Sequence, residues 1–139
     1  MNIRSFQPHD AAAITALWQA CGLMRPWNDA AKDIARKATV QPDLFLVAEV
    51  NDLIVGCAMF GYDGHRGWVN YLAVAPDHQR RGIARALMAE GETRLISLGC
   101  PKLNLQVRSG NRAVLEFYHR LGYATDDVVS LGKRLIADA

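Results

Sequence analysis

A short run of small and basic residues follows an apolar stretch in the middle of the chain. Residues 68–74 are mostly apolar, residues 75–78 form a short turn, and residues 79–84 read QRRGIA. This order predicts a strand, a turn and the start of a helix. The first turn of a helix has backbone N–H groups without partners in the helix, and together with the helix dipole they attract anions. Gly82 and Ala84 lack bulk, so a diphosphate can approach the backbone closely.

Three arginines strengthen this prediction of a phosphate site. Arg80, Arg81 and Arg85 place positive charge near the same helix end. The spacing matches neither the GxGxxG loop of dinucleotide-binding proteins nor the GK[ST] loop of Walker-type proteins. The alternative is an ordinary helix start with solvated arginines, because short clusters of Gly and Arg are common.

Hydrophobic periodicity predicts the elements around this run. Strands are expected over residues 2–6, 44–50, 53–62, 68–74 and 103–107, with one or two more between residues 123 and 135. Helices are expected over residues 10–21, 28–39, 82–98 and 111–121. Asp10, Asn111 and either Asn28 or Asp29 are expected to cap three of these helices.

The composition is that of one ordinary globular domain over residues 1–139. Half of the residues are hydrophobic, which is enough for one core. The net charge of +2 is too small to indicate a nucleic-acid-binding protein. No apolar run approaches the roughly 20 residues that span a bilayer, so no membrane partner is expected.

The cysteines argue against a metal or disulfide framework. Cys21, Cys57 and Cys100 are odd in number and far apart, with no CxxC pair. No metal is therefore expected. The first residues lack the apolar core of a signal peptide, so we expect a cytoplasmic protein with reduced thiols.

In this strand–turn–helix setting, the run resembles the signature of the GNAT acetyltransferase superfamily, Q/R-x-x-G-x-G/A. Gln79, Gly82 and Ala84 match its three defined positions. The family's second motif, N…FY…LGY, is similar to Asn111, Phe117, Tyr118 and residues 121–123. The resemblance extends over essentially the whole chain, and residues 23–29, 61–67, 99–102 and 130–135 are similar to segments of small bacterial acetyltransferases.

The resemblance implies an α/β (α+β) fold of the GNAT type. Such a fold has a mixed central β-sheet of six or seven strands flanked by four helices. The fourth and fifth strands splay into a V, because a bulge in the fourth strand turns it away from the fifth.

The resemblance also implies acetyl-CoA as the co-substrate, held in that V. The cofactor-binding residues it implies are Leu72, Ala73, Val74, Gln79, Arg80, Arg81, Gly82, Ile83, Ala84, Asn111 and Tyr118. Residues 79–84 would hold the pyrophosphate and residues 72–74 the pantetheine arm. A backbone N–H near Val74 would stabilise the charge that develops on the thioester oxygen.

Two of these residues have a structural alternative. Tyr118 matches the family's tyrosine that donates a proton to the departing thiolate, but it also lies on an apolar helix stripe and would suit a core. Asn111 is either a helix cap, a cofactor contact or both.

The general base is left open. Many family members place a Glu on the strand that contacts pantetheine, where this chain has Asn70 and Tyr71. Glu49, Asp63, His65 and an ordered water chain are the alternatives.

The acceptor implied is an amine of a small molecule, an amino acid, a peptide or a protein N-terminus. Trp27, Tyr62 and Trp68 are candidates for an apolar wall, and Asp29 and Asp63 for attraction of a cation. The alternative for both aspartates is local turn and cap chemistry. A homodimer is left open, and the competing functions are an acyl-CoA sensor and a ribosome-associated module.

Overall fold

The structure is a computed structural model, and it describes residues 1–138. Its contacts divide the chain into two compact units, Met1–Leu105 together with Asp138, and Gln106–Ala137. The expectation of a single domain over residues 1–139 stays a prediction.

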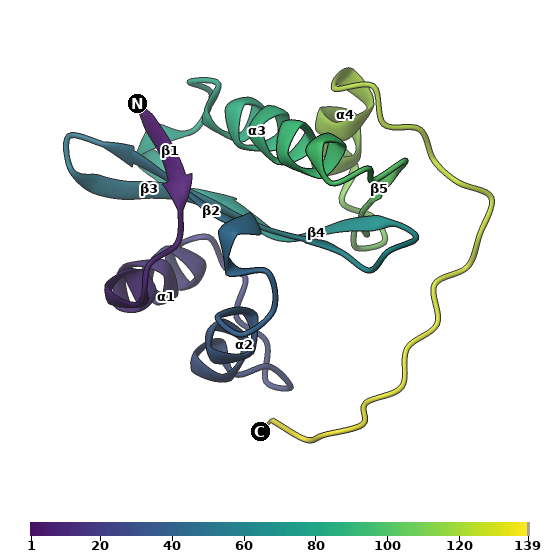
Figure 1. The fold of residues 1–139 in the computed structure, drawn as a ribbon, viewed down its shortest axis with the longest axis horizontal. Coiled ribbons are helices and arrows are strands. Elements are labelled where there is room, and N and C mark those ends of the chain that lie inside the picture. The colour runs from purple at the N-terminus through teal and green to yellow at the C-terminus, as the bar shows by residue number, and fades with distance from the viewer. Residues whose placement is uncertain (139) are drawn as a thin grey trace. The chain divides into compact units, whose positions relative to one another are not determined.

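The first unit is built on a five-stranded mixed sheet in the order β1-β2-β3-β4-β5 (Figure 1). The strands are β1 (Asn2–Ser5), β2 (Phe45–Val50), β3 (Leu53–Tyr62), β4 (Gly67–Val74) and β5 (Leu103–Asn104). The first four strands pair antiparallel, and β5 pairs parallel with β4. Asn51 and Asp52 both have positive φ, 51° and 64°, so the predicted two-residue turn of the β2–β3 hairpin is confirmed.

Helices cover both faces of this sheet. The helices α1 (Ala11–Ala20) and α2 (Ala30–Lys37) lie on one face, and α3 (Ile83–Ser97) lies on the other (Figure 1). Short 3-10 turns are η1 (Pro8–Asp10), η2 (Pro42–Leu44) and η3 (Pro76–His78). No helix in the described part of the chain is both long and apolar enough to cross a membrane.

Two of the predicted caps have different outcomes. Asp29 caps α2, because its Oδ1 accepts from Lys32 N at 2.9 Å. Asp10 precedes α1 but its side chain makes no cap bond to it. The Asp10 carboxylate accepts instead from Gln7 N at 2.8 Å and from the Arg4 guanidinium at 2.8 and 2.9 Å. The Asp10 carboxylate is therefore bound by Arg4 of β1 and does not cap α1.

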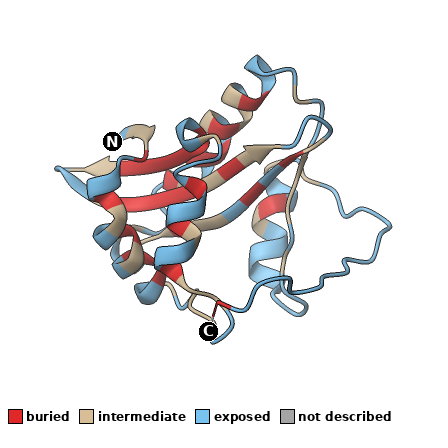
Figure 2. Cartoon of the chain, turned by 60° about the horizontal axis from the view of Figure 1, so that its bottom comes forward, coloured by how far each residue is buried: buried red, intermediate tan, exposed pale blue. Residues whose placement is uncertain are grey.

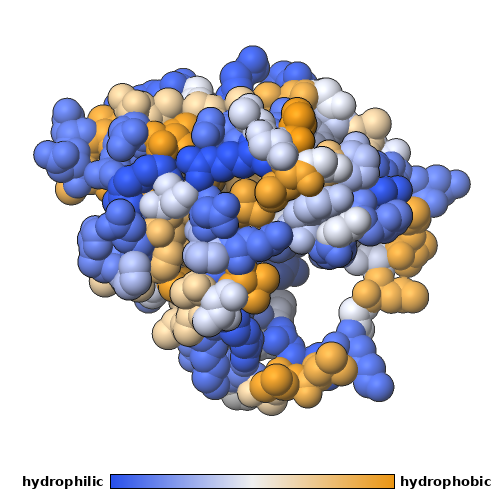
Figure 3. Space-filling model, viewed as in Figure 1, coloured by the Kyte–Doolittle hydropathy of each residue, from blue (hydrophilic) through white to orange (hydrophobic). Residues whose placement is uncertain are grey.

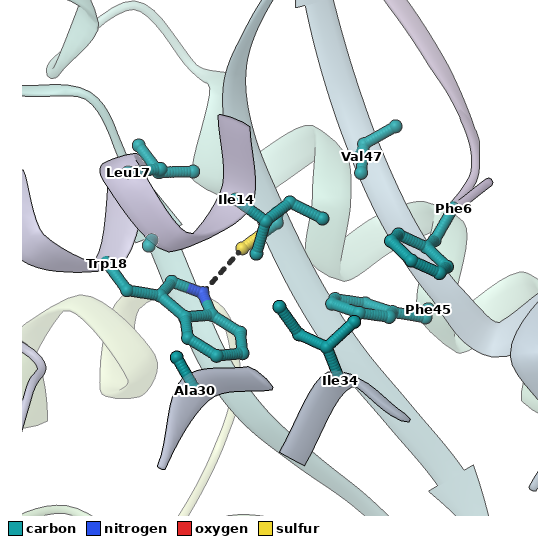
Figure 4. Packing of buried hydrophobic residues seen from close by; sticks show 10 residues of the cluster. Phe6, Ile14, Leu17, Trp18, Ala30, Ile34, Phe45 and Val47 are labelled. Atoms are coloured by element: carbon teal, nitrogen blue, oxygen red, sulfur yellow. Dashed lines mark hydrogen bonds between the residues drawn. The ribbon is translucent and has the colours of Figure 1, made fainter. Parts of the chain in front are cut away.

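The core follows from the two-residue period of β3. Gly56 faces Ile83 and Leu87 of α3, whereas the next residue, Cys57, faces Trp18 of α1. Because β3 is buried on both faces, its sequence is a nearly continuous apolar run. The buried residues gather where the sheet meets its helices (Figure 2). On the α1–α2 face the cluster includes a stacked pair of rings, Phe6 and Phe45, 4.9 Å apart (Figure 4).

The second unit contains α4 (Arg112–Arg120). Asn111 caps it, with Oδ1 accepting from Val114 N at 3.3 Å, so the cap interpretation of Asn111 is confirmed. Residues 121–137 contain no helix or strand in the described chain.

The expected number of strands, six or seven, is therefore wrong: the described residues form five. Val128, Val129 and Leu131 are 78%, 85% and 92% exposed, and apolar surface lies along this segment (Figure 3). A strand is stable only beside a neighbour, and β-propensity alone does not supply one. The fifth strand is also shorter than the expected residues 103–107, because it pairs only through Leu103 and Asn104.

The packing of α3 on β3 predicts a large effect at Gly91. A Cβ atom on Gly91 would lie 2.1 Å from Cζ and 2.4 Å from Cε1 of Phe60, which has no exposed surface. We expect Gly91→Ala to lower the free energy of unfolding by about 1–3 kcal/mol or more, measured by urea denaturation.

Gly61→Ala is the matched control on β3. There a Cβ atom would meet no neighbour closer than 3.6 Å, so the stability should change little. Equal stabilities of the two variants would contradict this packing.

Candidate active site

The first turn of α3 has backbone amides without a cap. Gly82 is the N-cap residue, with φ 81° and ψ 9°, and no side chain caps the helix. Ala86 N donates to Gly82 O at 3.0 Å, so the amides of Ile83, Ala84 and Arg85 precede the first bond of the helix. Such amides, at the positive end of a 15-residue helix, favour a bound anion.

The space over this turn is open. A Cβ atom built on Gly82 would meet no atom within 4 Å. The glycine is therefore required by its positive φ and not by a neighbouring group of the protein. Arg80 also has a positive φ, 64°, and its side chain and that of Arg81 are exposed. The first turn of α3 therefore has no cap and no close neighbour over Gly82.

Gln79 joins this turn to the sheet. Its Nε2 donates to the carbonyl of Val74, the last residue of β4, at 3.1 Å. The side chain therefore ties the start of the loop back to the strand end, and its contact in the structure is with the backbone.

The strand β4 carries a bulge. Cys57 pairs with Ala73 and Met59 pairs with Asn70, so Tyr71 and Leu72 stand opposite the single residue Ala58. Tyr71 adopts φ 54°, in the left-handed region. A bulge of this kind bends the strand and increases its twist.

The bulge leaves one edge of β4 open. Strand β5 pairs only with Gly67 and Trp68, at the start of β4, so no described strand pairs with that edge from Val69 onward. Ala75 N donates to Val55 O at 2.7 Å. Because Ala73 and Ala75 face β3, the amide of Val74 and the carbonyls of Leu72 and Val74 are directed away from β3. The Val74 carbonyl accepts from Gln79 Nε2 and from Cys21 Sγ, at 3.1 and 3.2 Å. The splayed arrangement expected between the fourth and fifth strands is confirmed.

Comparison with known proteins identifies the family of the chain. A model of the acetyltransferase (GNAT) family matches residues 11–123. An acetyltransferase of Pectobacterium atrosepticum is 55% identical over 138 residues, which cover 99% of this chain and 98% of the relative. The chain belongs to the GNAT acetyltransferase family.

Solved structures agree in fold with this GNAT acetyltransferase. Ard1 from Thermoplasma volcanium superimposes with a TM-score of 0.77 at 25% identity, covering 88% of this chain and 82% of that one. The PaiA N-acetyltransferase of Thermoplasma acidophilum, in complex with coenzyme A, superimposes with a TM-score of 0.81 at 18% identity and covers 92% of each chain.

Tyr118 and Asn111 belong to the second unit of the acetyltransferase, and the other predicted site residues to the first. Tyr118 is 7% exposed, and its ring makes edge contacts with Phe117 and Tyr123 at 5.1 and 5.7 Å between centroids. Burial raises the pKa of Tyr118 to about 12, so the phenol is protonated at neutral pH.

Two of the candidate bases have local partners. Glu49 of β2 forms an ion pair with Arg4, which also binds Asp10. Asp63 accepts from the amides of Arg66 and His65 at 2.7 and 2.8 Å, and these bonds hold its pKa below the usual range. A carboxylate with a lowered pKa is a weak base. Both side chains therefore have structural roles.

Two of the candidate acceptor-binding residues also accept local backbone hydrogen bonds. Asp29 is the cap of α2, and Asp63 closes its turn, so the structural interpretation of both is supported. Trp27 and Trp68 are 49% and 38% exposed. Among the described residues, no group of three His, Cys, Asp or Glu side chains is arranged to hold a metal ion.

Sequence reasoning missed a cluster around the bulge. Tyr71 stacks on Trp18, with ring centroids 3.8 Å apart and planes 10° from parallel, and its hydroxyl donates to Asp33 Oδ2 at 2.6 Å. The one signal in the sequence was Tyr71 itself, at a strand position where family members often carry Glu.

The buried phenol predicts a pH effect on stability. A raised pKa means that folding favours the neutral form, so this stabilisation is present below pH 10 and is lost as the pH rises through 12. We expect the stability of the wild type to fall more steeply above pH 10 than that of Tyr118→Phe, measured by urea denaturation. Equal slopes would contradict the burial of this hydroxyl.

Proposed function

We propose that this chain transfers the acetyl group of acetyl-CoA to an amine, by direct attack in a ternary complex. The observation that carries the proposal is the uncapped first turn of α3, joined through Gln79 to the open edge of β4. The amides of residues 82–85 would hold the pyrophosphate, and the backbone of Leu72 and Val74 would bind the amide groups of the pantetheine arm. The coenzyme A bound in a protein of the same fold supports this.

Acetyl-CoA supplies an activated thioester carbonyl. The chain orients it against the amine, and this alone removes much of the barrier. The amide of Val74, directed to the open edge, is suited to stabilise the negative charge on the carbonyl oxygen.

Tyr118 is the proposed partner of the departing thiolate. Its pKa of about 12 lies above the roughly 8.5 of a thiol. Full proton transfer to the thiolate is therefore uphill, and Tyr118 would act mainly as a hydrogen-bond donor to the sulfur. Because Glu49 and Asp63 are held by local partners, His65 or a water would take the proton of the amine.

The phosphate site is tested by Gly82→Glu. A carboxylate there would stand where the diphosphate binds, and we expect loss of acetyl-CoA binding by at least a hundredfold in calorimetry. Gly64→Glu is the matched control, since Gly64 also has a positive φ, 90°, and open space around it. Wild-type affinity in Gly82→Glu would refute the assignment of the loop.

The role of Tyr118 is tested by Tyr118→Phe with a free-thiol readout on a panel of amines, amino acids and peptides. Loss of one hydrogen bond to a charged group should lower kcat about ten- to hundredfold and leave the Kd for acetyl-CoA nearly unchanged. Tight acetyl-CoA binding by the wild type without turnover on any amine would favour an acyl-CoA sensor instead.

A further inference from the structure

Tyr71 occupies a backbone conformation that tyrosine rarely adopts. Its φ of 54° places it in the left-handed region, which costs an ordinary residue about 1 kcal/mol or more. Such a residue persists only where its surroundings hold it. Its position is also specific, because it is the first of the two bulge residues that stand opposite Ala58.

Contacts with Trp18, Asp33 and Cys57 hold Tyr71. Its ring stacks on Trp18, which has no exposed surface, and its hydroxyl donates to Asp33 of α2. Its backbone carbonyl accepts from Cys57 Sγ at 3.3 Å, and the same sulfur accepts from Trp18 Nε1 at 3.2 Å. Burial raises the pKa of the Cys57 thiol to about 12, so the thiol keeps the proton that it donates.

These contacts connect α2 to the open edge of β4. The bulge directs the backbone of Leu72 and Val74 away from β3, and the Asp33–Tyr71 hydrogen bond connects a side chain of the bulge to α2. Asp33 is itself fixed on the helix, with Oδ1 3.6 Å from Arg36 Nη1.

We propose that Tyr71 is a positioning residue of acetyl transfer, held in its bulge conformation by Asp33 and Trp18 so that the amide of Val74 meets the thioester oxygen. The inference rests on the proposed function. The first turn of α3, the proposed phosphate site, makes none of these contacts. Tyr71 therefore affects the chemical step more than the affinity for acetyl-CoA. A displacement of about 1 Å in a reacting group can lower a rate about a hundredfold.

The experiment compares Tyr71→Phe, Asp33→Ala and the double variant with the wild type. Tyr71→Phe keeps the stacked ring and removes only the hydroxyl, and Asp33→Asn, which keeps an acceptor oxygen, should restore most of the rate lost in Asp33→Ala. We expect kcat to fall about ten- to hundredfold in each single variant, with the Kd for acetyl-CoA within about threefold of wild type. The double variant should be no slower than the slower single variant, because both changes remove the same Tyr71–Asp33 hydrogen bond.

Thr15→Val is the control, since it also removes one hydroxyl bond, to Ala11 O at 2.9 Å, from the same helical layer. It should keep the wild-type kcat. Wild-type kcat in Tyr71→Phe, or additive losses in the double variant, would overturn the inference while the acetyltransferase assignment stands. A wild type that turns over no amine would instead overturn the proposed function.

Discussion

The extra residue in β4 is the constraint on which the rest of the structure depends. An antiparallel pair normally satisfies the backbone groups of both strands, and a parallel neighbour would satisfy the other edge of β4. With Tyr71 and Leu72 opposite Ala58, the strand turns away from β5, which pairs only through its two residues. The result is a strand at the centre of the fold with polar backbone along one edge. A ligand rich in amides is a natural partner for such an edge.

The first turn of α3 adds the partial positive charge of a helix N-terminus to this backbone edge. Most helices satisfy their first amides with Ser, Thr, Asp or Asn at the N-cap, and α2 does so with Asp29. Helix α3 has Gly82 at that position, which has no side-chain acceptor and leaves the first amides without a cap. The contrast between the two helix starts is a difference of one side chain. It separates a helix whose first amides are capped from one whose first amides are not.

Local chemistry explains which parts of the fold were predictable from the sequence. The turn at Asn51 and Asp52 and the start of a helix at Gly82 depend on their nearest neighbours in the chain, and both were predicted. A cap at Asn28 or Asp29 was predicted for the same reason, and Asp29 is the cap. The strands expected after residue 123 were wrong, because a strand depends on a partner that periodicity does not reveal. The cap at Asp10 failed for a similar reason, since Arg4 arrives from another element. The Trp18–Tyr71–Asp33 contacts join three separate segments, so no local pattern could predict them.

Three acidic residues of the described chain are held by local partners. A carboxylate that accepts two backbone amides, as Asp63 does, gains stability as an anion and loses basicity by the same interaction. Glu49 is held by a guanidinium, and Asp33 accepts the hydroxyl of Tyr71. The sequence places acidic residues near the predicted chemistry, but the fold uses them to fix the turn, the first strand and the bulge. In this acetyltransferase these three carboxylates contribute to geometry, and in the proposed mechanism the amides of Val74 and of the first turn of α3 would meet the developing and the fixed negative charge.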